Sequence, residues 1–130
     1  MKTRQIYITE HDMDRLRSLM EVYTENTDLL EEMLDKARIV LPKDVPRNVV
    51  TMNSTVRVKD VDTGEERTFT LVFPGGRADN SAVSILAPAG TALTGRREKE
   101  IVERHVPAGR KRMQILEIIY QPEREGKYEV

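Results

Sequence analysis

The hydrophobic pattern of the chain changes its period at a segment marked by two prolines, residues 41–47. Before this segment, apolar side chains recur every three or four positions, which is typical of one buried face of a helix. Two such stripes precede it: Met13, Leu16, Met20 and Tyr23, and then Leu30, Met33, Leu34 and Ala37. After it, apolar and polar residues alternate, as in a strand with one buried face. The pattern therefore predicts an α+β fold, with a helical part at residues 1–42 and a sheet domain at residues 43–130.

The helical part is predicted to be a short antiparallel hairpin. Thr9 is a good N-cap for the first helix, with Asp12 three residues later, and Thr27 can cap the second helix. The connection between the two stripes is tight, so the helices should pack against each other as a short coiled coil. A helix of about 15 residues is only ~20 Å long. The tip of this hairpin is formed by Glu25, Asn26, Thr27 and Asp28.

The sheet domain is expected to be an antiparallel sheet organised around residues 83–95, where an apolar strand turns into one short helix. Val83, Ile85 and Leu86 favour a buried central strand. Pro88 ends this strand because proline cannot donate a hydrogen bond to the ladder. Residues 89–93 fit one helical turn, which Gly95 can end.

Further strands are expected at residues 49–52, 55–61, 67–73, 101–106 and 113–120. The turn residues Asp62–Glu65 join two of these strands in a hairpin. The strand at 113–120 is apolar on both faces, as expected when a strand is covered on both sides. The charged tail, residues 121–130, is expected to be loosely held.

Composition excludes several classes of function. The 130 residues include no cysteine, so a disulfide and a thiol nucleophile are both impossible. The 21 Lys and Arg residues nearly cancel the 22 Asp and Glu residues, so the whole chain has no net attraction to nucleic acid or to a membrane. No apolar run approaches the length of a membrane span or a secretory signal, which favours a cytoplasmic location.

The chain carries no motif typical of an enzyme. It lacks a phosphate-binding loop, a Gly-x-Gly-x-x-Gly fingerprint and a His-Glu-x-x-His motif. Its two histidines, His11 and His105, stand apart from any Ser/His/Asp arrangement. We therefore expect no catalytic residue, no metal site and no cofactor.

Basic residues gather in two short segments of the sheet domain. Arg96 and Arg97 are followed by Lys99, and residues 110–112 are Arg-Lys-Arg. Both segments flank turns, so they serve either to solvate the edges of the sheet or to dock an acidic protein or a nucleic-acid backbone. No aromatic residues are interleaved with them, which argues against stacking on single-stranded bases.

The order of these elements resembles the GreA/GreB family, the Gre transcript-cleavage factors of bacterial RNA polymerase. The sheet domain is similar to their C-terminal, FKBP-like domain. The residues that carry this resemblance are Val83-Ser84-Ile85, Pro88, Ala92-Leu93, Gly95, Pro107-x-Gly109 and Ile115-x-x-Ile118-x-Tyr120. The short-hairpin members, the regulators of nucleoside diphosphate kinase, are the closer match. Their pattern appears at residues 49–54, Val-Val-Thr-Met-Asn-Ser, and 120–123, Tyr-Gln-Pro-Glu.

The resemblance implies a non-enzymatic transcription regulator that binds RNA polymerase near its secondary channel, with only indirect contact to DNA or RNA. In the family, the sheet domain sits at the rim of the channel, and the acidic tip of a long hairpin enters it to support RNA cleavage. A hairpin of ~20 Å is too short to reach the active centre. Docking is then expected at Leu86, Ala87, Pro88, Gly90, Thr91, Arg96 and Arg97.

One departure from the family pattern concerns this docking segment. Gre factors carry an Asp and a Ser before the proline, whereas this chain has Leu86 and Ala87 before Pro88, so the contact is expected to be weaker or more apolar. Two alternatives stay open. In one, Glu25 and Asp28 attract Mg²⁺ and assist transcript cleavage. In the other, the chain is an adaptor that acts on nucleoside diphosphate kinase or another protein independently of transcription.

Overall fold

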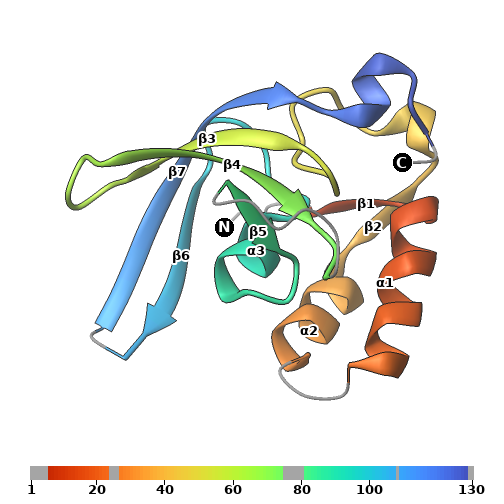
Figure 1. The fold of residues 1–130 in the computed structure, drawn as a ribbon, viewed down its shortest axis with the longest axis horizontal. Coiled ribbons are helices and arrows are strands. Elements are labelled where there is room, and N and C mark those ends of the chain that lie inside the picture. The colour runs from red at the N-terminus through yellow and green to blue at the C-terminus, as the bar shows by residue number, and fades with distance from the viewer. Residues whose placement is uncertain (1–5, 24–26, 75–80, 108, 129–130) are drawn as a thin grey trace.

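The computed structural model describes residues 6–23, 27–74, 81–107 and 109–128, which form a mixed α+β fold (Figure 1). The N-terminal part contains β1 (Tyr7–Thr9), α1 (Glu10–Val22), α2 (Asp28–Lys36), β2 (Arg38–Val40) and the 3₁₀ turn η1 (Pro42–Asp44). The rest contains β3 (Thr55–Asp60), β4 (Glu66–Val72), β5 (Ala82–Ser84), α3 (Pro88–Leu93), β6 (Ile101–Val106), β7 (Gly109–Tyr120) and the 3₁₀ turn η2 (Pro122–Glu125). None of the described helices is long and apolar enough to cross a membrane.

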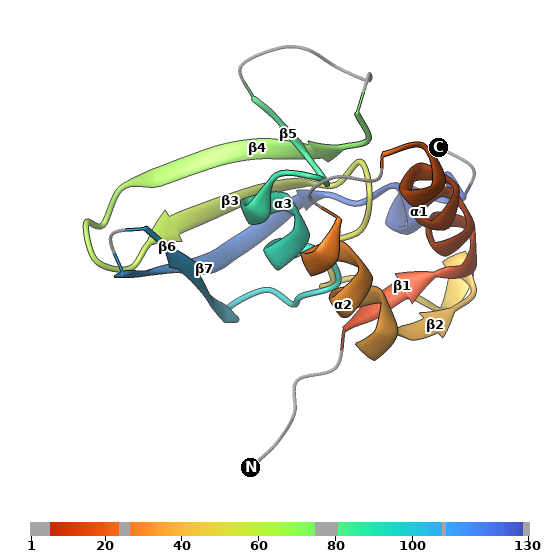
Figure 2. The same cartoon turned by 90° about the horizontal axis from the view of Figure 1, so that it is seen from below.

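The first helix begins where its capping residue predicts. The Thr9 hydroxyl accepts a hydrogen bond from the backbone N–H of Asp12 at 3.1 Å, which satisfies one of the free amides of the first turn. The second helix ends at Lys36, so the prediction that Ala37 belongs to it is wrong by one residue. The chain then forms β2, which no pattern predicted, and β2 pairs with β1 in parallel. The two helices therefore connect two strands that lie side by side (Figure 2).

The larger sheet has five strands in the order β5-β4-β3-β7-β6. The predicted hairpin of strands is present and consists of β3 and β4. Gly64 lies in its turn at φ +78°, and the Asp60 N–H donates to the Glu65 carbonyl at 2.8 Å. The expectation of an entirely antiparallel sheet is wrong at one pair, because β4 and β5 run parallel. The predicted strand at residues 83–86 is therefore not central. It is a three-residue, half-buried strand at the edge of the sheet, and the fully buried Ile85 follows it.

Residues 49–52 do not form the predicted strand. Val49 makes only an isolated bridge to Arg97, and Asn53 has a left-handed φ of +67° that interrupts extended backbone. The hydroxyl of Ser54 accepts the Thr51 N–H at 3.0 Å, and the Ser54 N–H returns to the Thr51 carbonyl at 3.0 Å. A side chain thus replaces the hydrogen bond that a neighbouring strand would supply. We call residues 49–54 the 49–54 loop.

Two other expectations for the C-terminal half are wrong. The last strand is covered on one face only, since Ile119 is 48% exposed while Ile115 and Ile118 are buried. The tail is also held more firmly than predicted. The Gln121 side chain is fully buried, and its amide donates hydrogen bonds to the carbonyls of Pro46 and Val49 at 2.9 and 2.7 Å.

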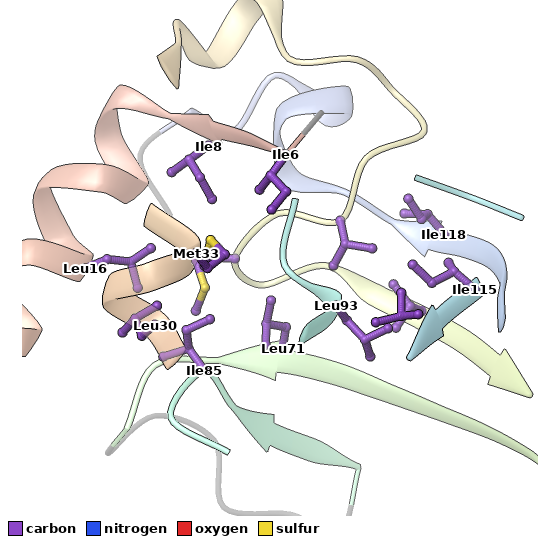
Figure 3. Close-up of a cluster of buried hydrophobic side chains, with 14 of the residues drawn as sticks. Ile6, Ile8, Leu16, Leu30, Met33, Leu71, Ile85, Leu93, Ile115 and Ile118 are labelled. Atoms are coloured by element: carbon purple, nitrogen blue, oxygen red, sulfur yellow. The ribbon is translucent and has the colours of Figure 1, made fainter. Parts of the chain in front are cut away.

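A single hydrophobic core joins the helices to the sheet. Figure 3 shows buried side chains converging from both parts of the chain. Leu16 of α1 and Leu30 and Met33 of α2 belong to the same cluster as Leu71 of β4 and Leu93 of α3. Burial of this apolar surface is the main force holding the elements together. The helix pair therefore shares the core of the sheet, with α1 beside β1 and β2 and α2 beside α3 (Figures 1 and 2).

Candidate functional site

The segment that leads into α3 is built by short-range hydrogen bonds. Pro88 occupies the first turn of the helix, where its missing N–H costs nothing and its fixed φ suits the helix. The Thr91 N–H bonds to the Ala87 carbonyl at 3.0 Å, and the Thr91 hydroxyl donates to the Ile85 carbonyl at 2.5 Å. Gly90 lies so close to Ser84 that an added Cβ would stand 2.2 Å from the Ser84 carbonyl oxygen. These contacts set α3 tightly against the chain that precedes it.

The structure separates the predicted docking residues into accessible and structural ones. Pro88 is exposed, and Leu86 and Ala87 are half-buried, so these three present apolar surface. Gly90 and Thr91 are buried and serve the packing of α3 instead. The turn that leads into α3 therefore presents apolar side chains at its accessible positions.

A groove runs between α2 and α3, and we call it the α2–α3 groove. It encloses about 390 Å³. Leu29 and Met33 of α2 form one side, and Pro88 and Ala92 of α3 form the other. Leu29 is 57% exposed, so it presents apolar surface at the groove. Arg96 and Arg104 are also among the residues that line the groove.

The two arginines predicted to take part in docking already have partners within the chain. Arg96 pairs with the buried carboxylate of Glu100 at 3.0 Å. Arg97 donates to the Tyr7 hydroxyl at 3.0 Å and stacks over the Tyr7 ring at 5.2 Å. Arg97 therefore connects the sheet domain to β1, a role that no sequence pattern indicated.

The second basic cluster is neutralised by acidic neighbours. Arg110 pairs with Glu103 at 2.9 Å, and Arg112 pairs with Asp62 at 2.7 Å. Lys111 lies 3.9 Å from Asp60. Of the two interpretations of this cluster, these pairs favour solvation of the sheet edge over a phosphate-binding patch, since each cation already faces a carboxylate.

The predicted hairpin tip is described only in part. Glu25 and Asn26 lie outside the described residues, Thr27 is buried and Asp28 is exposed. Within the described residues, no three His, Cys, Asp or Glu side chains gather closely enough to hold a metal ion.

Sequence reasoning missed a buried polar cluster at the start of α1. Asp12 is only 4% exposed, and its carboxylate accepts the Met52 N–H at 3.3 Å. Burial raises the pKa of the Asp12 carboxyl to about 7, and the neighbouring Glu123 carboxylate raises it further. The sequence spacing indicates this burial, because Asp12 stands four residues before Leu16 and therefore lies on the same, buried face of the helix.

Comparison with known proteins gives two family matches that together span most of the chain. Residues 4–40 match the family model described as Rnk N-terminus. Residues 45–120 match the model described as Transcription elongation factor, GreA/GreB, C-term. The boundary between the two matches falls within the proline-marked segment.

Individual relatives agree with these matches. The regulator of nucleoside diphosphate kinase from Escherichia coli (strain K12) is 37% identical, over 98% of each chain. Transcription elongation factor GreA from Clostridioides difficile (strain 630) is 43% identical, over 68% of this chain and 57% of its own. A solved structure of a prokaryotic transcription elongation factor GreA/GreB from Nitrosomonas europaea is 38% identical and superposes with a TM-score of 0.74. It covers 89% of this chain and 100% of its own.

Proposed function

Because the chain belongs to the GreA/GreB family and carries the Rnk N-terminus, we propose that it binds RNA polymerase near the secondary channel and regulates transcription without cleaving RNA. In this proposal, residues 43–130 form an FKBP-like domain that docks on the polymerase. Residues 1–42 form a coiled-coil hairpin that blocks or modulates the channel entrance. The protein would act in the cytoplasm, with only indirect contact to DNA or RNA.

The observation that carries the proposal is the position of the helix pair. The longer helix, α1, has 13 residues and is therefore only ~20 Å long. Leu16, Leu30 and Met33 are buried in the core shared with the sheet, so the first half of α1 and most of α2 are packed against the rest of the protein. A probe that carries catalytic groups into a deep channel needs a long, free-standing hairpin. This arrangement supports regulation at the entrance in preference to assistance with cleavage.

The docking surface that we propose is the α2–α3 groove together with the exposed Pro88 turn. Apolar centres with polar rims are typical of protein interfaces, and Leu29, Met33, Pro88 and Ala92 supply such a centre. This surface fits the departure of Leu86 and Ala87 from the polar family pattern.

Retention on immobilised core RNA polymerase tests the proposal. We expect the wild-type protein to bind and Pro88→Asp to bind at least tenfold more weakly, because the new charge would be desolvated in the interface. Thr63→Asp is a matched control, since it adds the same charge in an exposed turn that accepts aspartate. A folded wild-type protein that does not bind polymerase would refute the proposed function.

A second assay separates regulation from cleavage. The protein is added to stalled elongation complexes with Mg²⁺, and the RNA is measured. An unchanged transcript is expected, whereas shortened RNA would support the cleavage alternative that involves Glu25 and Asp28.

The second candidate function is an adaptor that acts on nucleoside diphosphate kinase. The specific observation in its favour is the name of the Escherichia coli relative, which matches over nearly the whole chain. Direct binding of the purified kinase, with no binding of polymerase, would favour this function. In the proposal that we prefer, any effect on the kinase is indirect and follows from transcription.

A further inference from the structure

Two segments singled out in the sequence, residues 49–54 and 120–123, have no role in the proposed docking surface. The structure brings both to the first turn of α1. The Thr51 hydroxyl donates to the Glu123 carboxylate at 2.7 Å and also lies 2.9 Å from the Ser54 hydroxyl. The next residue, Met52, donates its N–H to the Asp12 carboxylate. The start of α1, the 49–54 loop and η2 thus meet at one buried polar cluster.

We propose that this cluster is a proton-operated latch, in which protonated Asp12 holds the start of α1 against the 49–54 loop and η2, and ionised Asp12 releases it. Asp12 is a buried polar side chain of α1, and its carboxylate accepts the Met52 N–H of the loop, beside apolar packing by Met13 and Leu16. A charged carboxylate at a buried position pays a large desolvation cost unless ion pairs and hydrogen bonds compensate for it. The latch is therefore expected to be tight when Asp12 is neutral.

Three parts of the chain place polar or charged groups against Asp12. From α1 and its cap, Arg15 and the Thr9 hydroxyl favour the ionised carboxylate, and from the loop the Met52 N–H does the same. From η2, Glu123 opposes ionisation by like-charge repulsion. Desolvation is the largest effect and outweighs the three favourable contacts, so the pKa of Asp12 rises to about 7.

The pKa of Glu123 is set by a different balance of effects, because Glu123 is less deeply buried than Asp12. Burial raises its pKa, whereas the hydrogen bond from Thr51 and the charge of His11 lower it. The buried Nε2 of His11 has no hydrogen-bond partner among the described residues. The carboxylates of Asp12 and Glu123 and the imidazole of His11 thus lie in one cluster.

The direction of the pH effect follows from linkage. In the released form, the Asp12 carboxyl would have its ordinary pKa of about 3.9. In the latched form, its pKa is about 7. Between these values the latched form keeps a proton that the released form has lost, so raising the pH favours release. The ratio of latched to released protein should fall about fiftyfold between pH 5 and pH 7 and change little above pH 8.

Hydrogen exchange measured by NMR on the whole protein tests the latch. Protection factors, corrected for intrinsic exchange rates, are compared at pH 5, 6, 7 and 8 for the amides of α1 and for those of β3 and β7. For the wild type, we expect the protection factors in α1 to fall about fiftyfold between pH 5 and pH 7. The protection factors in β3 and β7 should stay constant over the same range. Equal loss in all three elements, or constant protection in α1, would overturn the proposal.

Three substitutions sharpen this test. Asp12→Asn should remove the pH dependence of α1, because the amide still accepts the Met52 N–H and does not ionise. Asp14→Asn is the matched control, since it neutralises an exposed acid on the same turn, and it should leave the wild-type profile unchanged. Glu123→Gln should move the midpoint to lower pH by removing the repulsion.

A direct titration covers the case in which Asp12→Asn does not fold. The carboxyl carbon of Asp12 in the wild-type protein is followed by NMR as the pH is raised. A midpoint near 7 supports the latch, and a midpoint near 4 rules it out.

Discussion

Replacing Gly90 with alanine sets two physical effects of opposite sign against each other. Gly90 is buried in α3, and its φ lies outside the left-handed region that favours glycine. On helix propensity alone, alanine at this position would stabilise the protein by up to ~1 kcal/mol. The new Cβ, however, would lie 2.2 Å from the Ser84 carbonyl oxygen and 3.2 Å from the Ile85 Cα. Both neighbours are backbone atoms, so neither can rotate away.

The expected magnitude follows from this geometry. Restoring an ordinary contact requires α3 to move by roughly 1 Å, and overpacking of this kind costs ~1–3 kcal/mol. The same movement stretches the bond from the Thr91 hydroxyl to the Ile85 carbonyl, which contributes another ~1 kcal/mol. After subtraction of the propensity gain, Gly90→Ala should destabilise the protein by ~1–3 kcal/mol. For a chain of this length, that corresponds to a fall in Tm of about 4–11 °C.

Thermal unfolding followed by circular dichroism measures this shift. Gly126→Ala is the control, because Gly126 has φ +75° and open space around it, so that variant reports backbone strain without a clash. A Gly90→Ala variant as stable as the wild type, or more stable, would refute the reasoning. Since α3 forms one side of the proposed docking groove, the folded variant should also bind polymerase more weakly.

Three further predictions concern stability. Thr9→Ala should cost ~1 kcal/mol in urea unfolding, because it removes the cap of α1, and an unchanged midpoint would contradict this. Leu93→Ala should cost ~2–5 kcal/mol, since Leu93 is completely buried in the core; a loss below ~1 kcal/mol would mean that the core closes around the cavity. Arg112→Ala should leave the midpoint of urea unfolding unchanged at physiological salt, because its ion pair with Asp62 is half-exposed; a lower midpoint would show that the sheet edge depends on that pair.

Several local features could be predicted from the sequence because their causes lie within a few residues. Thr9 caps α1 through a bond to a residue three positions away. Gly64 permits the turn of the β3–β4 hairpin. The helical turn predicted at residues 89–93 is α3, which begins one residue earlier at Pro88. The change of hydrophobic period also indicated which part of the chain is helical and which forms the sheet, since each period reports the geometry of one element.

The candidate site was predictable only in outline. The sequence singled out the turn around Pro88, where the structure leaves Pro88 exposed and buries Gly90 and Thr91. The α2 side of the groove, with Leu29 and Met33, was not identified. Arg97 resembled a free docking residue because its partner, Tyr7, is 90 positions away. The tail resembled a loose segment because charge dominates its composition, although the buried Gln121 side chain anchors it.

By itself, the sequence determined the local elements of this protein, since propensity, caps and turns act between near neighbours. Only the tertiary structure decided that β5 lies parallel at the sheet edge and that Asp12 meets a loop 40 residues further along the chain. The physical reason is that long-range pairing depends on how whole faces pack together, and no local period specifies the partner. Burial that is decided at this level turns an ordinary capping-position acid into a group that titrates near neutral pH.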